Sequence, residues 1–98
     1  MNAERFGLTS KILEEIIQHA KSNNVEKIII FGSRARGDYK EKSDIDIAIS
    51  GGTQDLFCCD IDESISTLLK FDIVCLDKPV QDELIKEIDR DGVVIYEK

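Results

Sequence analysis

The order of apolar and polar positions along the chain predicts four strands separated by helices. The runs Val25–Phe31, Ile45–Ile49, Phe71–Leu76 and Val93–Tyr96 are rich in β-branched and aromatic residues, and polar or glycine-containing segments bound them. The first run ends in four consecutive apolar residues, which is too continuous for a strand with one wet face. We therefore expect it to be a central strand that is covered on both sides.

Apolar residues at helical spacing predict a helix before the first strand. Thr9 or Ser10 can cap its start, and Asn23-Asn24 ends it. Lysine, glutamate and glutamine fill the intervening positions, so one face of this helix should cover a sheet. The expected inner face comprises Leu8, Ile12, Leu13, Ile16, Ile17 and Ala20.

Two further helices are expected after the second and third strands. The earlier one runs from about Thr53 or Asp60 to Leu69, and the later one opens at Pro79 and stops at Gly92. Strands that alternate with helices predict an α/β domain of two or three layers. The expected inner faces comprise Ile61, Ile65, Leu68 and Leu69 in the earlier helix, and Val80, Leu84, Ile85 and Ile88 in the later one.

Length and charge narrow the possible functions. The 98 residues allow one small domain, residues 1–98, with a single sheet and its helices. The 13 basic and 20 acidic residues give a net charge of −7, which argues against nucleic-acid binding and would suit a basic protein partner. The N-terminus is polar and no apolar run approaches membrane length, so we expect a cytoplasmic protein that contacts no membrane.

Cysteine and histidine usage supports neither a disulfide framework nor a zinc site. The count of three cysteines is odd, and Cys58 and Cys59 are adjacent. With Cys75 and His19 they make four potential ligands, but the spacing of a zinc site is absent. We expect buried or half-buried thiols and a solvated His19.

The segment Gly32–Ile49 carries the candidate chemistry. It begins with a Gly32-Ser33 turn after a buried run, continues through a charged loop, and reaches Asp44 and Asp46 at the head of the next apolar run. Because strand side chains alternate between faces, both carboxylates should point the same way, opposite to the isoleucines of that run. Like charges so placed repel each other unless a cation lies between them, and Mg²⁺ prefers such oxygen clusters.

One further carboxylate, Asp72, interrupts the apolar third strand. A buried and unpaired carboxylate is costly, so Asp72 should have a partner. Asp77, a few residues later, is the alternative candidate for a third carboxylate of the site.

These segments together resemble the signature of the DNA polymerase β-like nucleotidyltransferase superfamily, which is Gly-Ser, a short spacer and then Asp-x-Asp on the next strand. The form GSRARG followed by SDIDIAI is similar to the minimal nucleotidyltransferases (MNT), the MntA-type antitoxins encoded beside HEPN-domain toxins. Phe71-Asp72-Ile73-Val74 resembles the strand that bears the family's third carboxylate. The resemblance implies the nucleotidyltransferase fold: α/β (α+β), with a mixed central sheet of about four strands and flanking helices.

The resemblance also implies roles for the matching residues. Asp44 and Asp46 would hold Mg²⁺, and Asp72 would complete the site for a second ion and help to deprotonate the attacking hydroxyl. Gly32 would let the backbone approach a phosphate. Ser33 would offer its hydroxyl and backbone N–H groups to the terminal phosphates of the nucleotide, although a helix cap is an alternative role for it.

Arg34 and Arg36 are candidates to offset charge on the phosphate oxygens. Arg36 is the better candidate, because a guanidinium suits bidentate contact with phosphate. The alternative for both is a solvated basic loop.

The activity that the resemblance implies is transfer of AMP from ATP to a tyrosine of a partner HEPN ribonuclease, which neutralises this toxin. The chain would then be an Mg²⁺-dependent protein adenylyltransferase. The residues after Asp46 are needed to finish the fold, so we expect a partner to position the acceptor. Two alternatives stay open: a non-catalytic antitoxin that acts by direct binding, and a nucleotidyltransferase that acts on a small molecule such as an aminoglycoside.

Overall fold

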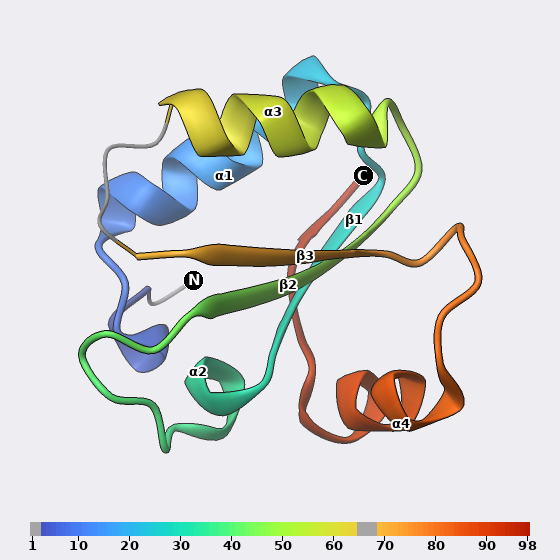
Figure 1. Cartoon of the computed structure of the whole chain (residues 1–98). Helices are drawn as coiled ribbons and strands as arrows, with labels where there is room; N and C mark the ends of the chain where they lie inside the picture. The colour runs from blue at the N-terminus through green and yellow to red at the C-terminus, as the bar shows by residue number, and fades with distance from the viewer. Residues whose placement is uncertain (1–2, 65–68) are drawn as a thin grey trace.

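The computed structural model describes residues 3–64 and 69–98 of the chain. In the described residues, helices and strands alternate as the pattern predicts (Figure 1). The elements are the 3₁₀-helix η1 (Ala3–Phe6), α1 (Ser10–Ser22), β1 (Lys27–Phe31), α2 (Ser33–Arg36), β2 (Ile45–Ser50), α3 (Gln54–Ser64), β3 (Phe71–Cys75), α4 (Asp82–Asp91) and β4 (Val93–Glu97).

The strands of the described residues form one four-stranded mixed sheet in the order β3-β2-β1-β4. Strand β1 pairs antiparallel with both β2 and β4, whereas β2 and β3 run parallel. The expected α/β class with a mixed sheet is therefore confirmed, and β1 is central as predicted. The register sets Phe31 of β1 opposite Asp46 of β2, and Asp46 beside Asp72 of β3.

The two faces of the sheet are covered by different helices: α1 and α3 lie on one face, and α4 lies on the other (Figure 1). The isoleucines of β2 are fully buried in the cluster beneath α1 and α3, whereas Ala48 packs with Phe31 and Ile88 on the α4 face. The predicted alternation along β2 is thus confirmed. It places the side chain of Asp46 on the α4 face, since residues two apart on a strand share a face.

Helix α1 has the predicted start and end. Thr9 is its cap, and the Thr9 hydroxyl accepts a hydrogen bond from the Ile12 backbone N–H at 3.2 Å. Leu13, Ile16 and Ala20 form its buried face. The segment before it was not predicted to be ordered, yet Phe6 of η1 is fully buried in the main core.

Helix α4 begins three residues later than Pro79, with Gln81 as the cap and Asp82 as its first residue. Acidic residues in the first turn favour this start, because they complement the positive end of the helix dipole. The predicted inner face is also too wide: Ile88 is buried, but the side chain of Ile85 is 40% exposed. The stop at Gly92 is confirmed.

Helix α3 starts at Gln54, close to the earlier of the two predicted starts. Ile61 is buried as expected, and Phe57, which was not predicted, is fully buried beside it. Ile65 and Leu68 lie outside the described residues. All three cysteines are free thiols, and Cys59 is exposed while Cys58 and Cys75 are half-buried. Within residues 3–64 and 69–98, no helix combines the length and apolar character that a bilayer crossing requires.

Candidate active site

Asp46 and Asp72 come together because β2 and β3 are parallel neighbours in register. Both line a cavity of about 290 Å³ on the α4 face of the sheet. Glu87 of α4 is a third acidic residue of this cavity, and the apolar side chains Phe31, Val74 and Leu84 complete its lining. Asp44, the other predicted carboxylate, precedes β2 and is exposed.

The predicted repulsion between carboxylates is concentrated at Asp46. Burial raises the pKa of Asp46 to about 6, and the negative charges of Asp72, Asp44 and Glu87 add to this rise, while Arg36 opposes it. Asp72 was predicted to be the buried carboxylate that needs a partner. Asp72 is instead exposed, because β3 is an edge strand, and Asp46 on a central strand is the half-buried one.

The raised pKa of Asp46 predicts how stability changes with pH in the metal-free protein. The folded state binds the Asp46 proton more tightly than the unfolded state, so folding stability is lost as pH rises from about 4 through about 6. In chelator at pH 8, Asp46→Asn should therefore raise the free energy of unfolding by about 1 kcal/mol, discounted because water screens a half-buried group. Urea unfolding at pH 4 and pH 8 measures this change.

The gain from Asp46→Asn should disappear at pH 4, where Asp46 is already protonated in the folded state. Glu14→Gln, which removes an exposed acid of α1 on the other face, is the matched control and should show no such pH-dependent gain. An equal gain at both pH values would show that the ionised carboxylate does not cause the strain.

The Gly32-Ser33 turn lies directly against Asp46. Gly32 has φ +74°, a conformation that favours glycine, and a Cβ at this position would overlap the Asp46 carboxylate. Ser33 follows as the first residue of α2, and its backbone C=O accepts a hydrogen bond from the Gly37 N–H at 2.9 Å. The two halves of the sequence motif are thus in contact, and absence of a side chain at Gly32 leaves room for Asp46.

Arg34 is buried, with 1% of its surface exposed, and its guanidinium donates only to backbone carbonyl groups. It contacts the Phe6 O at 2.8 Å, the Gly7 O at 3.2 Å and the Ser43 O at 2.8 Å, with a weaker contact to Glu41 O at 3.4 Å. These bonds join the N-terminal turn to the loop that leads into Asp44.

The Arg34 guanidinium also lies over the Tyr39 ring, 5.1 Å from its centroid. Its donors are therefore committed within the protein, so Arg34 holds the fold together and is not free to bind the nucleotide as predicted. Burial lowers the pKa of Arg34, and the charges of Tyr39, Asp44 and Asp46 oppose that shift. Arg34 thus supplies a fixed positive charge behind the acidic site.

Arg36 lies at the edge of the site in a set of ion pairs. Its guanidinium contacts Asp38 at 3.2 Å, Asp91 at 3.3 Å and Glu87 at 3.6 Å. The hydrogen bonds to Asp38 and Asp91 raise the pKa of Arg36. Because these pairs are partly exposed, Arg36 can exchange them for another anion at little cost.

Glu87 was missed by the sequence reasoning. Its signal was available: it follows Leu84 by three positions, so a helix places both on the same face. What the spacing could not show is that this face of α4 lies over the carboxylates of β2 and β3.

The carboxylates fit a hard divalent cation by their chemistry. Their donor atoms are all oxygens, which Mg²⁺ prefers, and Mg²⁺ binding would relieve the repulsion between the negative charges at Asp46. Within the described ranges, no group of three or more histidine, cysteine, aspartate or glutamate side chains is close enough together to hold a metal ion. Asp46 and Asp72 are therefore candidate ligands that lie beside each other, and Asp44, which precedes β2, does not complete a group of three with them in this structure.

The alternative third carboxylate, Asp77, lies at the other end of the sheet. Its Oδ2 accepts hydrogen bonds from the Gly51 N–H at 2.8 Å and from the Gln54 side chain at 2.6 Å. Gly51 follows the end of β2, whereas Asp46 lies near its start. Asp77 therefore has a local structural role and does not reach Asp46.

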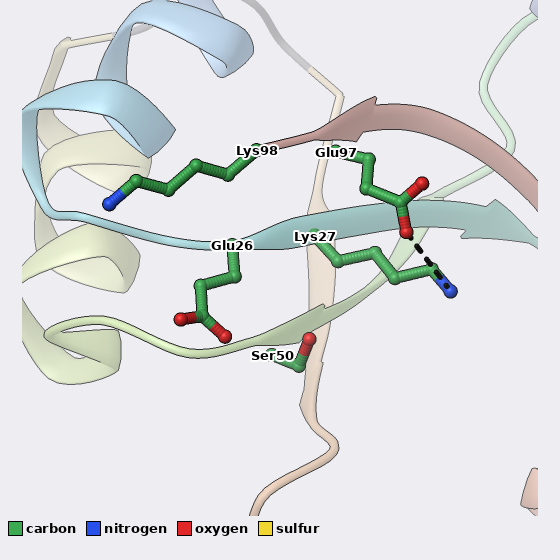
Figure 2. A pocket seen from close by; sticks show the side chains of 5 residues that line it. All are labelled: Glu26, Lys27, Ser50, Glu97 and Lys98. Carbon is green, nitrogen blue, oxygen red and sulfur yellow. Dashed lines mark ion pairs between the residues drawn. The ribbon is translucent and has the colours of Figure 1, made fainter.

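A second cavity, of about 300 Å³, lies at that far end of the sheet (Figure 2). It is lined by Glu26, Lys27, Ser50, Glu97 and Lys98. Lys27 and Glu97 are cross-strand partners, and their side chains form an ion pair at 3.8 Å. Because Lys27 begins β1 and Phe31 ends it, this cavity is separated from the Asp46 cavity by the length of the strand.

The chain is similar to known proteins over a region that includes the Gly32–Ile49 segment. Residues 14–98 match the family described as Polymerase beta, Nucleotidyltransferase. A proposed protein adenylyltransferase of Methanocaldococcus jannaschii is 45% identical over 67 residues, which is 65% of this chain and 65% of that protein. The aligned part is thus just under two thirds of the relative's length.

Two crystal structures of toxin–antitoxin complexes contain chains with the same fold. One is a complex with AMP-PNP. The match to it covers 88% of this chain and 73% of the chain in that structure, with a TM-score of 0.65 and 21% identity. The other is the toxin–antitoxin MntA–HepT, with 92% of this chain and 74% of that chain covered, a TM-score of 0.61 and 19% identity. At these identities the likeness shows the fold.

Proposed function

This chain belongs to the polymerase β nucleotidyltransferase family, and on that premise we propose that it is an Mg²⁺-dependent protein adenylyltransferase that neutralises a HEPN-domain toxin. The acceptor is a tyrosine hydroxyl of the toxin, and the donor is ATP. We also propose that residues 1–98 form one domain that acts in the cytoplasm. The observation that carries the proposal is the contact of the Gly32 turn with Asp46, which itself lies beside Asp72.

The similar proteins support the substrate and the partner. The M. jannaschii relative carries the name of a protein adenylyltransferase, and it is 45% identical to this chain over 67 residues. One structural neighbour was crystallised with AMP-PNP, and another is a toxin–antitoxin pair. A reaction with ATP as the donor and a toxin protein as the acceptor agrees with all of these similar proteins.

In the proposed reaction, the acceptor hydroxyl oxygen attacks the α-phosphorus of ATP and forms a new P–O bond. The bond from the α-phosphorus to the α–β bridging oxygen breaks, and pyrophosphate leaves with that electron pair. The hydroxyl proton passes to the Asp72 carboxylate, which is exposed and can reach a bound acceptor. Mg²⁺ held by Asp44, Asp46 and Asp72 would supply positive charge for the phosphate oxygens.

The remaining residues of the site bind and orient the phosphates. The backbone N–H groups at Gly32 and Ser33 and the Ser33 hydroxyl hold the terminal phosphates, which a side chain at position 32 would obstruct. Arg36 exchanges its surface ion pairs with Glu87 and Asp91 for a phosphate oxygen. Arg34 positions the loop before Asp44 from behind and touches no substrate.

The test is incubation of the protein with its HEPN-domain partner, ATP and Mg²⁺, followed by the intact mass of the toxin and its ribonuclease activity. We expect the toxin to gain the mass of one or more adenylyl groups and to lose activity, and we expect neither change when EDTA replaces Mg²⁺. Neutralisation without any mass gain would favour the non-catalytic binding antitoxin. A labelled small-molecule product with an unmodified toxin would favour the small-molecule transferase.

A further inference from the structure

The cavity that holds Asp46 and Asp72 shares two lining residues with a neighbouring cavity, the Val80 cavity. Val74 of β3 and Leu84 of α4 line both of them. The Val80 cavity has a volume of about 410 Å³, and its lining is mostly apolar, with Ile73, Pro79 and Val80 among its residues. We call these two adjacent cavities the β3–α4 groove; their lining residues extend from the carboxylates to the loop before α4.

The β3–α4 groove wraps around the outer edge of the sheet. Ile73 packs toward the core cluster on the α1 and α3 face, whereas Val74 packs toward the cluster on the α4 face. A cavity lined by both residues must lie over the edge of the strand that carries them. Among the described residues, β3 pairs only with β2, so its outer backbone groups can bond to an added extended segment.

The direction of the reaction decides which substrate the groove receives. In an in-line displacement the attacking oxygen and the leaving oxygen lie on opposite sides of the phosphorus. The phosphates that leave are placed at Gly32 and Ser33, which follow β1 on one side of Asp46. The groove opens on the other side, beyond Asp72 on β3, so it faces the attacking hydroxyl.

Charge at the groove selects the kind of acceptor segment. Asp46 and Asp72 at its inner end would be neutralised by Mg²⁺, so Glu87, which Arg36 leaves for a phosphate oxygen, is the acid that faces the segment. Among the described residues, Lys78 is the one basic side chain that lines either cavity. The whole chain carries a net charge of −7. A segment with basic residues near the acceptor hydroxyl and apolar residues flanking it complements this surface.

We propose that the β3–α4 groove binds an extended, basic and apolar segment of the acceptor protein and delivers its hydroxyl residue to Asp72. This inference rests on the proposed function and adds the surface by which the acceptor is chosen. Val80 and Leu84 contact the apolar residues of the segment, and the edge of β3 pairs with its backbone.

The experiment compares the variants Val80→Arg and Leu84→Arg with Ile85→Arg, which lies on the same helix but is 40% exposed and outside the groove. The measurements are KM and kcat for AMP transfer to the HEPN-domain partner and the Kd for ATP with Mg²⁺. We expect both groove variants to raise the KM for the toxin by about tenfold or more, because a charge replaces an apolar contact. The Kd for ATP of Val80→Arg, which lies outside the Asp46 cavity, and the kinetics of Ile85→Arg should stay within about twofold of the wild type.

Val80 belongs to neither core cluster, so Val80→Arg tests the groove even if Leu84→Arg disturbs the packing of α4. Transfer by the wild type together with an unchanged KM in Val80→Arg would overturn this inference alone. Absence of transfer by the wild type would overturn the proposed function, and the inference with it.

Discussion

Replacing Asp46 by asparagine, alone or together with Asp44→Asn, should lower the rate of AMP transfer by about a thousandfold or more. Asp46 is the carboxylate on which the site converges: it contacts the Gly32 turn, lies beside Asp72 and carries the raised pKa. Removing its charge removes the oxygen ligand that would balance a cation at the reacting phosphate, and losses of this size follow when such electrostatic stabilisation is lost. Initial rates from intact mass spectra of the toxin measure the loss.

The control for Asp46→Asn is Asp77→Asn. Asp77 bonds only to Gly51 and Gln54 at the far end of β2, so its amide variant should transfer AMP at nearly the wild-type rate. Binding of the toxin should survive in both variants, since the fold is intact and Asp46→Asn relieves repulsion. Transfer by Asp46→Asn within about tenfold of the wild-type rate would show that Asp46 is not part of the catalytic machinery.

Arg34→Met should lower the free energy of unfolding by about 3–5 kcal/mol, because several buried carbonyl groups lose their donor at about 1–3 kcal/mol each. The variant keeps much of the side-chain volume but leaves the carbonyl groups of Phe6, Gly7 and Ser43 without their donor. Arg34→Lys should recover little, because one ammonium group cannot reach partners that the planar guanidinium bonds simultaneously. Urea unfolding followed by circular dichroism measures the change.

Arg36→Met is the matched control for Arg34→Met. Arg36 is only two residues away, but its ion pairs are partly exposed, so its urea midpoint should stay close to that of the wild type. In catalysis the larger effect should belong to Arg36→Met, which should raise the KM for ATP. If Arg34→Met unfolds at the same urea concentration as Arg36→Met, the buried network does not hold the loop.

The contrast between Arg34 and Arg36 shows where sequence reasoning ends. Their residue types and spacing are equivalent, and the sequence could rank them only by suitability for phosphate. Their difference comes from the position of η1, whose carbonyls receive Arg34. The polar N-terminal segment gives no periodic pattern from which that 3₁₀-helix could be predicted.

The contact between the Gly-Ser turn and the Asp-x-Asp strand was predictable from the resemblance, although 13 residues separate β1 from β2, a length that also allows a parallel crossover. The exposure of Asp72 was not. The run Phe71–Leu76 is interrupted by Asp72, so it predicts a strand without placing it in the centre or at the edge of a sheet, and the edge position of β3 decides the exposure of Asp72. The contribution of Glu87 also depends on the packing of α4, which begins after Pro79 at a point that propensity alone does not fix.

The pairing of β4 with β1 sets a condition on synthesis of this protein. The central strand Lys27–Phe31 is made early, but its partner Val93–Glu97 leaves the ribosome only after the rest of the described sheet. Until then the nascent chain exposes one edge of a strand with four consecutive apolar residues, which is a surface prone to pair with other chains. A chain released before Val93 would keep that edge open, so translational truncation should yield aggregated protein and not a smaller folded domain.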